Sequence, residues 1–167
     1  MAIFNYIPHN LKIKPTPIAG TQAIVSYDSI ALKTAGFNMQ ILIAELLSKI
    51  SKVAPKSVTV MGHFDTGAST TSIDIKLAEL LGLIPVGTSA IYTANGKAKT
   101  KSYIVSIGFP NTNLKPFDKL QINSCNLGFD ISKNSNAQNF GILIGRDIMS
   151  RWNIVWNGPT SSVFISD

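Results

Sequence analysis

The stretch GHFDTGAST, from Gly62 to Thr70, decides how the rest of the chain is interpreted. It completes a strand-like apolar run, SVTVMGHF (Ser57–Phe64), and places Asp65 at the start of a D-T-G turn. An isolated D-T-G is weak evidence of function, because an aspartate ahead of a glycine is common in ordinary turns. The segments on either side therefore determine whether Asp65 is a turn residue or a functional carboxylate.

A short helix and then a hairpin are predicted after this stretch. Asp74–Leu81 has helical spacing, and either Ser72 or Asp74 can cap its N-terminus. Ser89–Phe109 alternates like two strands joined at Asn95-Gly96, a dipeptide typical of hairpin turns. Further short elements are predicted: strands at Phe117–Ile122 and Ile142–Ile144, a helical turn at Arg146–Ser150, and a closing hairpin of Asn153–Trp156 with Val163–Ile165.

The segments before the D-T-G stretch predict a strand at Gln22–Leu32 and an inserted helix near residues 39–50. The helix prediction rests on apolar residues at helical spacing, ended by Pro55. Residues 1–17 are expected to form an extended arm, because several prolines break any helix there. Residues 18–167 then form a single domain. Many short strands with one or two helices indicate a mostly β fold.

Composition favours one globular domain. The 167 residues are enough for one core, and 45% of them are hydrophobic against 14% charged. The net charge is +6, but the lysines are scattered along the chain rather than interleaved with aromatic residues on one face. Such an interleaved face is what single-stranded nucleic acid requires, so we expect no nucleic-acid partner.

Cysteine and histidine usage narrows the classes of chemistry further. The single cysteine, Cys125, allows no intrachain disulfide, and nothing near it resembles an activated nucleophile for a Cys-His protease with His63. The only histidines, His9 and His63, lie in unrelated segments, so we expect no metal site. No secretory leader and no bilayer-spanning run is apparent. We therefore expect a cytoplasmic protein without a membrane partner.

Taken together, four segments resemble retropepsin-like aspartic proteases, including their single-domain bacterial branch. They occur in the family's order and cover most of residues 57–158: GHFDTGAST, TSIDIKLAELLGL, the hairpin AIYTANGKAKTKSYIVSI at the position of the family's flap, and ILIGRDIM. The resemblance implies a mostly β, closed-barrel-like retropepsin fold. It also implies an aspartic endopeptidase that acts on polypeptides and needs no cofactor.

The chemistry of that family requires two carboxyl groups. A pair that shares one proton can activate a water molecule and protonate the leaving amine, as aspartic proteases in general do. This chain contains a single D-T-G, and its other aspartates, among them Asp28, Asp118, Asp130 and Asp147, lie in unrelated contexts. If the enzyme is active, the second Asp65 comes from another copy across a two-fold axis. The sequence thus predicts a homodimer.

The resemblance assigns roles residue by residue. Asp65 is the catalytic residue, and the loop that supports it comprises Thr66, Gly67, Ala68 and Ser69. Thr66 and Arg146 are expected to buttress the dimer or the loop. The residues expected to contact substrate are His63, Gly67, Leu143 and, at the flap tip, Ala94, Asn95 and Gly96.

Two positions depart from the retroviral pattern. Ser69 stands where those enzymes carry an acidic residue that pairs with the arginine, which leaves Arg146 to pair with Asp147 or with another group. His63 replaces an aliphatic residue, and strand alternation places it on the same side as Asp65. We therefore expect His63 to favour a polar or acidic substrate side chain. The alternative function is a catalytically silent retropepsin-like domain for dimerisation or peptide binding.

Overall fold

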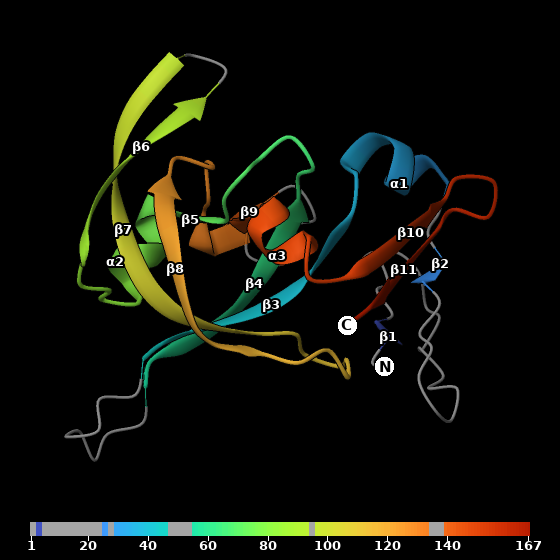
Figure 1. The fold of residues 1–167 in the computed structure, drawn as a ribbon, viewed down its shortest axis with the longest axis horizontal. Coiled ribbons are helices and arrows are strands. Elements are labelled where there is room, and N and C mark those ends of the chain that lie inside the picture. Colours follow the sequence, from blue (N-terminus) through green and yellow to red (C-terminus); the bar gives the residue numbers. More distant parts are fainter. Residues whose placement is uncertain (1–2, 5–24, 27–28, 47–54, 94–95, 134–138) are drawn as a thin grey trace.

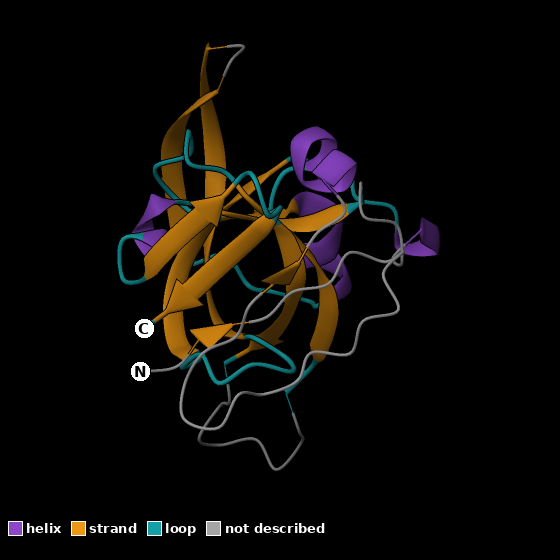
Figure 2. Cartoon of the chain, turned by 90° about the vertical axis from the view of Figure 1, so that its right-hand side faces the viewer, coloured by secondary structure: helices purple, strands orange, loops and turns teal. Residues whose placement is uncertain are grey.

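The computed structural model describes residues 3–4, 25–26, 29–46, 55–93, 96–133 and 139–167. The helices are α1 (Ser29–Ala35), α2 (Ile75–Leu80) and α3 (Arg146–Met149), with a 3-10 turn at Ile131–Lys133. The strands are β1 (Ile3–Phe4), β2 (Val25–Ser26), β3 (Asn38–Glu45), β4 (Ser57–Phe64), β5 (Ser72–Asp74), β6 (Gly87–Thr93), β7 (Gly96–Gly108), β8 (Phe117–Cys125), β9 (Phe140–Ile144), β10 (Asn153–Asn157) and β11 (Ser162–Ser166). Strands dominate the described chain, and the helices are short (Figure 2).

The larger sheet closes on itself. Its strand order is β3-β4-β9-β5-β8-β7-β6, and β3 also pairs with β7, so that all strands except β6 form a closed barrel (Figure 1). Strand β6 extends from the barrel as one arm of the β6–β7 hairpin. The expectation of a mostly β, closed-barrel fold is confirmed.

A smaller antiparallel sheet contains both ends of the described chain. Strand β11 pairs with β10 along one side and with β1 and β2 along the other. Ile3 and Phe4 are the only described residues of the expected arm at 1–17, and they form β1. The rest of that arm lies outside the described residues.

The helix expected near residues 39–50 is wrong. Residues 38–45 form strand β3, and residues 47–50 lie outside the described part of the chain. Met39, Ile41 and Ile43 are fully buried while Gln40 and Leu42 face outward, which is the two-residue period of a strand. Apolar residues on both faces imitated helical spacing, and pairing with β4 and β7 selects the strand.

The strand expected at Gln22–Leu32 is wrong over its last four residues. Among the described residues of that range, Val25–Ser26 is extended, whereas residues 29–32 belong to helix α1. Residues 22–24 and 27–28 lie outside the described part of the chain. Helix α1 ends at Ala35, and Gly36 follows with a φ of 68°, the left-handed conformation that glycine adopts after a helix. Leu32 is buried in the core, so tertiary packing supports the helix.

The elements predicted after the D-T-G stretch are confirmed. Helix α2 is capped by Asp74, whose side chain accepts a hydrogen bond from the Lys76 backbone N–H. The β6–β7 hairpin, β8, β9, α3 and the β10–β11 hairpin all lie within a few residues of the predicted segments. Local signals such as caps and turn residues are strong in this half of the chain, because each element is short and clearly bounded.

Candidate active site

Asp65 lies immediately after β4, which is paired with β3 and β9 in the barrel. Its backbone N–H donates to the Ile144 carbonyl at 3.1 Å, and the N–H of Phe64 donates to the Phe37 carbonyl at 2.9 Å. These bonds anchor the end of β4 between β9 and the segment that follows α1. The loop that begins at Asp65 is therefore fixed to the barrel at its origin.

The Asp65 carboxylate is oriented by the next turn of the chain. Its Oδ1 accepts a 2.7 Å hydrogen bond from the Gly67 N–H. A Cβ atom at position 67 would lie 3.0 Å from that same oxygen, closer than most real contacts. Glycine at this position therefore lets the backbone approach the carboxylate closely enough to bind it.

Residues of helix α3 are hydrogen-bonded to the loop that carries Asp65. The Arg146 backbone N–H donates to the Ala68 carbonyl at 3.0 Å, and its Nη1 donates to the Thr66 carbonyl at 2.6 Å. The sequence left open whether Asp147 would pair with Arg146, and in the structure Asp147 binds Thr71 instead. The Asp147 oxygens accept from the Thr71 N–H at 2.9 Å and from its hydroxyl at 2.7 Å.

Gly145 brings the α3 turn unusually close to the loop. The Thr71 hydroxyl accepts a 3.1 Å hydrogen bond from the Gly145 N–H. A Cβ atom at position 145 would lie 2.5 Å from the Thr70 carbonyl carbon and 2.7 Å from its oxygen. Because these are backbone atoms, they cannot turn aside as a flexible side chain could. The loop position therefore depends on a glycine in the G-R-D sequence.

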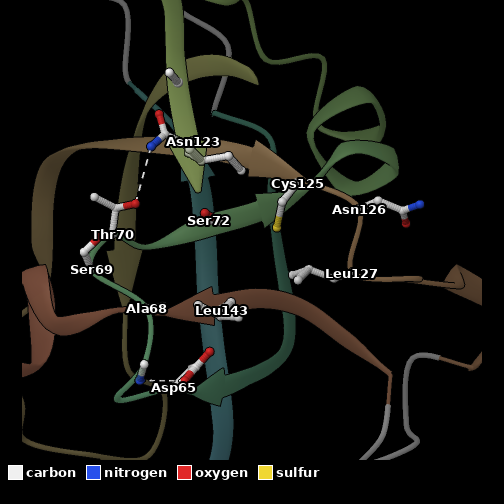
Figure 3. Close-up of a pocket in the computed structure, with 13 residues that line it drawn as sticks. Asp65, Ala68, Ser69, Thr70, Ser72, Asn123, Cys125, Asn126, Leu127 and Leu143 are labelled. Carbon is white, nitrogen blue, oxygen red and sulfur yellow. Dashed lines mark hydrogen bonds between the residues drawn. The ribbon is translucent and has the colours of Figure 1, made fainter. Parts of the chain in front are cut away.

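A cavity of about 590 Å³ lies beside Asp65 (Figure 3). Three paired strands form the floor of the cavity. Ser72 of β5 is paired with Leu143 of β9 on one side and with Asn123 of β8 on the other. Paired residues point to the same face of a sheet, and the neighbours Ile73 and Ile142 face the core. The cavity volume is in the range that accommodates ligands in proteins.

The structure brings five of the predicted site residues to this cavity. Asp65, Gly67, Ala68, Ser69 and Leu143 line it. Gly96 begins β7 at the hairpin with a φ of 104°. Residues 94 and 95, predicted as the rest of the flap tip, lie outside the described residues, so the roles of Ala94 and Asn95 stay predictions.

His63 does not line the cavity. Its Nδ1 is 2.7 Å from the Asn38 side-chain oxygen, and its ring lies 4.8 Å from that of Phe140. Burial lowers the pKa of His63, and the Asp65 carboxylate only partly opposes the shift. His63 pairs with Leu143 of β9, so it lies on the face of β4 that strand alternation predicted, but its side chain is not among those that line the cavity.

The remaining lining residues were not identified from the sequence as site residues: Thr70, Ser72, Ala90, Ile91, Asn123, Cys125, Asn126 and Leu127. Ala90 and Ile91 belong to the predicted hairpin, so the flap assignment pointed to their region. Asn123, Cys125 and Leu127 carry no motif, and only the pairing of β5 with β8 brings them here.

Cys125 lines the cavity, and its thiol is unreactive. Burial raises its pKa to about 11, against a lowering contribution from a Ser72 hydrogen bond. The reactive form of cysteine is the thiolate, so such a thiol is a poor nucleophile near neutral pH. This agrees with the sequence-based argument against a Cys-His protease.

Neither a membrane-spanning helix nor a metal centre occurs among the described residues. In that part of the chain, none of the helices is long and apolar enough to cross a membrane. The same residues contain no group of three or more His, Cys, Asp or Glu side chains that could hold a metal ion.

Comparison with known proteins gives one family match. A family model described as aspartyl protease matches residues 51–147. Among curated proteins, none matches the chain significantly.

Several solved structures are similar to this chain. A retropepsin-like aspartic protease from Rickettsia conorii is 17% identical over 86% of this chain and 89% of its own, with a TM-score of 0.47. The simian foamy virus (mac) protease is 17% identical over 66% of this chain and 89% of its own, with a TM-score of 0.36. The retroviral protease-like domain of Ddi1 from Leishmania major is 13% identical over 77% and 94%, with a TM-score of 0.35.

Proposed function

Because the chain belongs to the aspartyl protease family, we propose that it is an aspartic endopeptidase whose catalytic pair is Asp65 from each of two copies. The observation that carries this proposal is the position of one carboxylate. Asp65 lines a cavity of about 590 Å³, and its Oδ1 is held by the Gly67 N–H. A carboxyl group held in one orientation beside a cavity of this size is suited to act on a bound ligand.

The second copy follows from the chemistry of a single carboxylate. Among the described residues that line the cavity, Asp65 is the only acid. One carboxyl group cannot both accept a proton from water and donate a proton to the leaving amine in the same step. Two that share a proton can, because like charges so close do not both ionise. A two-fold axis beside the loop would supply the second group from an identical chain.

The proposed reaction is hydrolysis of a peptide bond. The ionised Asp65 takes a proton from water, whose oxygen attacks the carbonyl carbon, while the protonated Asp65 of the other copy donates a hydrogen bond to the carbonyl oxygen. The tetrahedral intermediate then collapses: its C–N bond breaks and the amine leaves with a proton from a carboxyl group. The Gly67 N–H keeps Oδ1 in place through these steps.

The proposed substrate is an extended polypeptide. The floor of the cavity comes from β5, β8 and β9, and Ala90 and Ile91 of the β6–β7 hairpin line it as well. A peptide held between a sheet and a hairpin can be bound through its backbone groups, and its side chains then enter pockets on alternate sides. No metal or organic cofactor takes part in the proposed reaction.

The proposal is tested by incubating denatured proteins with the wild-type chain and with Asp65→Asn, over roughly pH 4 to 7, where a carboxyl pair shares a proton. Asparagine keeps an acceptor for the Gly67 N–H but cannot exchange a proton. Asp118→Asn is the matched control, because Asp118 is an exposed residue of β8. We expect cleavage by the wild type and the control and none by Asp65→Asn. Absence of cleavage by all of them would favour the catalytically silent peptide-binding or dimerisation domain.

A further inference from the structure

We propose that Cys125, Leu127 and Leu143 form a subsite for an uncharged, apolar side chain of the substrate, and that Cys125 sets the largest side chain it accepts. This inference rests on the proposed function, because it names the substrate preference of the same cavity. It concerns the wall of the cavity away from the Asp65 loop.

The strand register brings these side chains together. Cys125 lies two residues beyond Asn123 on β8, so both point to the cavity face of the sheet. Leu143 reaches the same face from β9 through its pairing with Ser72. Figure 3 shows Cys125 and Leu127 on the opposite side of the view from Ser69 and Thr70, with Leu143 between them.

The two sides of the cavity differ in polarity. On one side lie the hydroxyl groups of Ser69 and Thr70 and the amide of Asn123. The Asn123 oxygen accepts a 3.0 Å hydrogen bond from the Ser102 hydroxyl, which fixes the amide in place. Such fixed polar groups suit the backbone of a peptide. On the other side, the Cys125 thiol and the Leu127 side chain suit an apolar side chain, because the amide of Asn126, which also lines the cavity there, points away from both (Figure 3).

The subsite carries no charge that could balance one on the substrate. Asp65 is the only charged residue among the described residues that line the cavity. The Cys125 thiol, whose pKa burial raises to about 11, stays protonated at any pH at which the enzyme would work. A lysine or aspartate side chain would lose hydration there, so binding would weaken. The nearby Asp74 carboxylate would not compensate a lysine fully, because its oxygens already accept from the N–H groups of Lys76, Leu127 and Phe129.

Strand pairing and hydrogen bonds hold the cavity wall at Cys125 in place, so residue 125 would limit the size of the substrate side chain. Cys125 pairs with Asp74 in the β5–β8 ladder. The buried Asp74 side chain accepts hydrogen bonds from the Leu127 N–H at 2.8 Å and the Phe129 N–H at 3.3 Å. The strand and the loop after it are thus fixed to one carboxylate. A larger side chain at position 125 would therefore project into the subsite rather than push the wall back.

The test uses binding, so that it does not depend on cleavage. The probes are peptides in which a hydroxyethylene group replaces the scissile bond, with Ala, Leu, Asp or Lys placed in turn at each flanking position. Cys125 is the only cysteine in the chain, so labelling of the wild-type protein with p-hydroxymercuribenzoate reports on this wall alone. This reagent reacts with thiols at about pH 5, where the carboxyl pair shares its proton. At one position, we expect the Leu peptide to bind at least about tenfold more tightly than the Asp and Lys peptides. The same peptide should slow labelling of Cys125 about tenfold or more, in proportion to the occupied fraction.

A matched pair of variants then tests the size limit. Cys125→Leu should remove most of the preference for the Leu peptide over the Ala peptide, and Cys125→Ser, which is nearly isosteric, should keep it. Tight binding with an unchanged labelling rate, or an unchanged Leu-to-Ala ratio in folded Cys125→Leu, would overturn the subsite and leave the protease proposal intact. If the wild type neither binds any of the peptides nor cleaves protein, the proposed function fails and the subsite with it.

Discussion

The Arg146 guanidinium donates a 2.6 Å hydrogen bond to the Thr66 carbonyl, so a residue at the start of α3 holds the loop that carries Asp65. The retroviral pattern would place an acidic residue where Ser69 stands, as the partner of this arginine. Here a backbone carbonyl accepts the bond instead. The carbonyl belongs to the residue directly after Asp65, so the contact holds the backbone next to the carboxylate.

Arg146→Ala should impair catalysis more than stability. Loss of the bond to Thr66 leaves the loop free to shift, and a displacement of about 1 Å at a reacting group can reduce the rate about 100-fold. The guanidinium is exposed, so the loss in free energy of unfolding should stay below about 1 kcal/mol. Comparison of kcat/KM with that of Arg151→Ala, an exposed arginine stacked on Phe117 rather than on the loop, checks this. Equal effects of the two variants would contradict the account.

Thr71→Val should destabilise the fold. The Thr71 hydroxyl, which is fully buried, donates to Asp147 and accepts from the Gly145 N–H. Valine has the same shape but leaves both groups without that partner, which typically costs about 1–3 kcal/mol. Urea denaturation at fixed protein concentration measures the change, with the exposed Thr88→Val as control. A loss no greater than that of Thr88→Val would show that the buried hydroxyl adds nothing.

Gly145→Ala should displace the loop. The new Cβ would lie 2.5 Å from a Thr70 backbone carbon, so either α3 or the loop must move. We expect a loss of stability of about 1–3 kcal/mol, as for overpacked cores, together with a marked loss of activity. Gly158→Ala is the control, because nothing lies within 4 Å of a Cβ at that position. Thermal and urea denaturation of both variants decide the point, and indistinguishable behaviour would contradict the close approach of Gly145 to Thr70.

His63 should make stability fall on acidification. Burial lowers its folded-state pKa below the ordinary value of 6.5, so the unfolded chain takes up the proton at a higher pH than the folded chain. The contribution of neutral His63 is therefore present above pH 6.5 and is lost as the pH falls through the folded-state pKa. The measurement is the free energy of unfolding of wild type minus that of His63→Gln between about pH 8 and pH 5. A difference in free energy that stays constant or grows on acidification would contradict this prediction.

The half of the fold around the active site could be predicted because its signals are local. The strand before Asp65, the capped helix α2 and the hairpin at Gly96 each follow from neighbouring residues. The segment before it could not, because Met39, Ile41 and Ile43 form a strand only through pairing with β4 and β7. Periodicity over so few residues does not separate a strand that is apolar on both faces from a helix.

The residues of the candidate site also divide into those predictable from local sequence and those set by long-range strand pairing. Asp65, Gly67 and Arg146 lie in motifs, so their neighbourhood was predictable from the sequence. Cys125 and Asn123 enter the cavity because β8 pairs with β5. The paired residues Ser72 and Asn123 are 51 positions apart in the chain. His63 was placed on the correct face, but its hydrogen bond to Asn38 depends on β3 being a strand.

The central claim is that one active site needs Asp65 from two chains, and mixed dimers test it most directly. Wild type and Asp65→Asn are unfolded together, refolded at a constant total concentration, and assayed at increasing fractions of wild type. Random pairing predicts activity that follows the square of the wild-type fraction, so an equal mixture should retain about one quarter of the activity. A linear decline to about one half, or activity in Asp65→Asn alone, would contradict a catalytic pair shared between two copies.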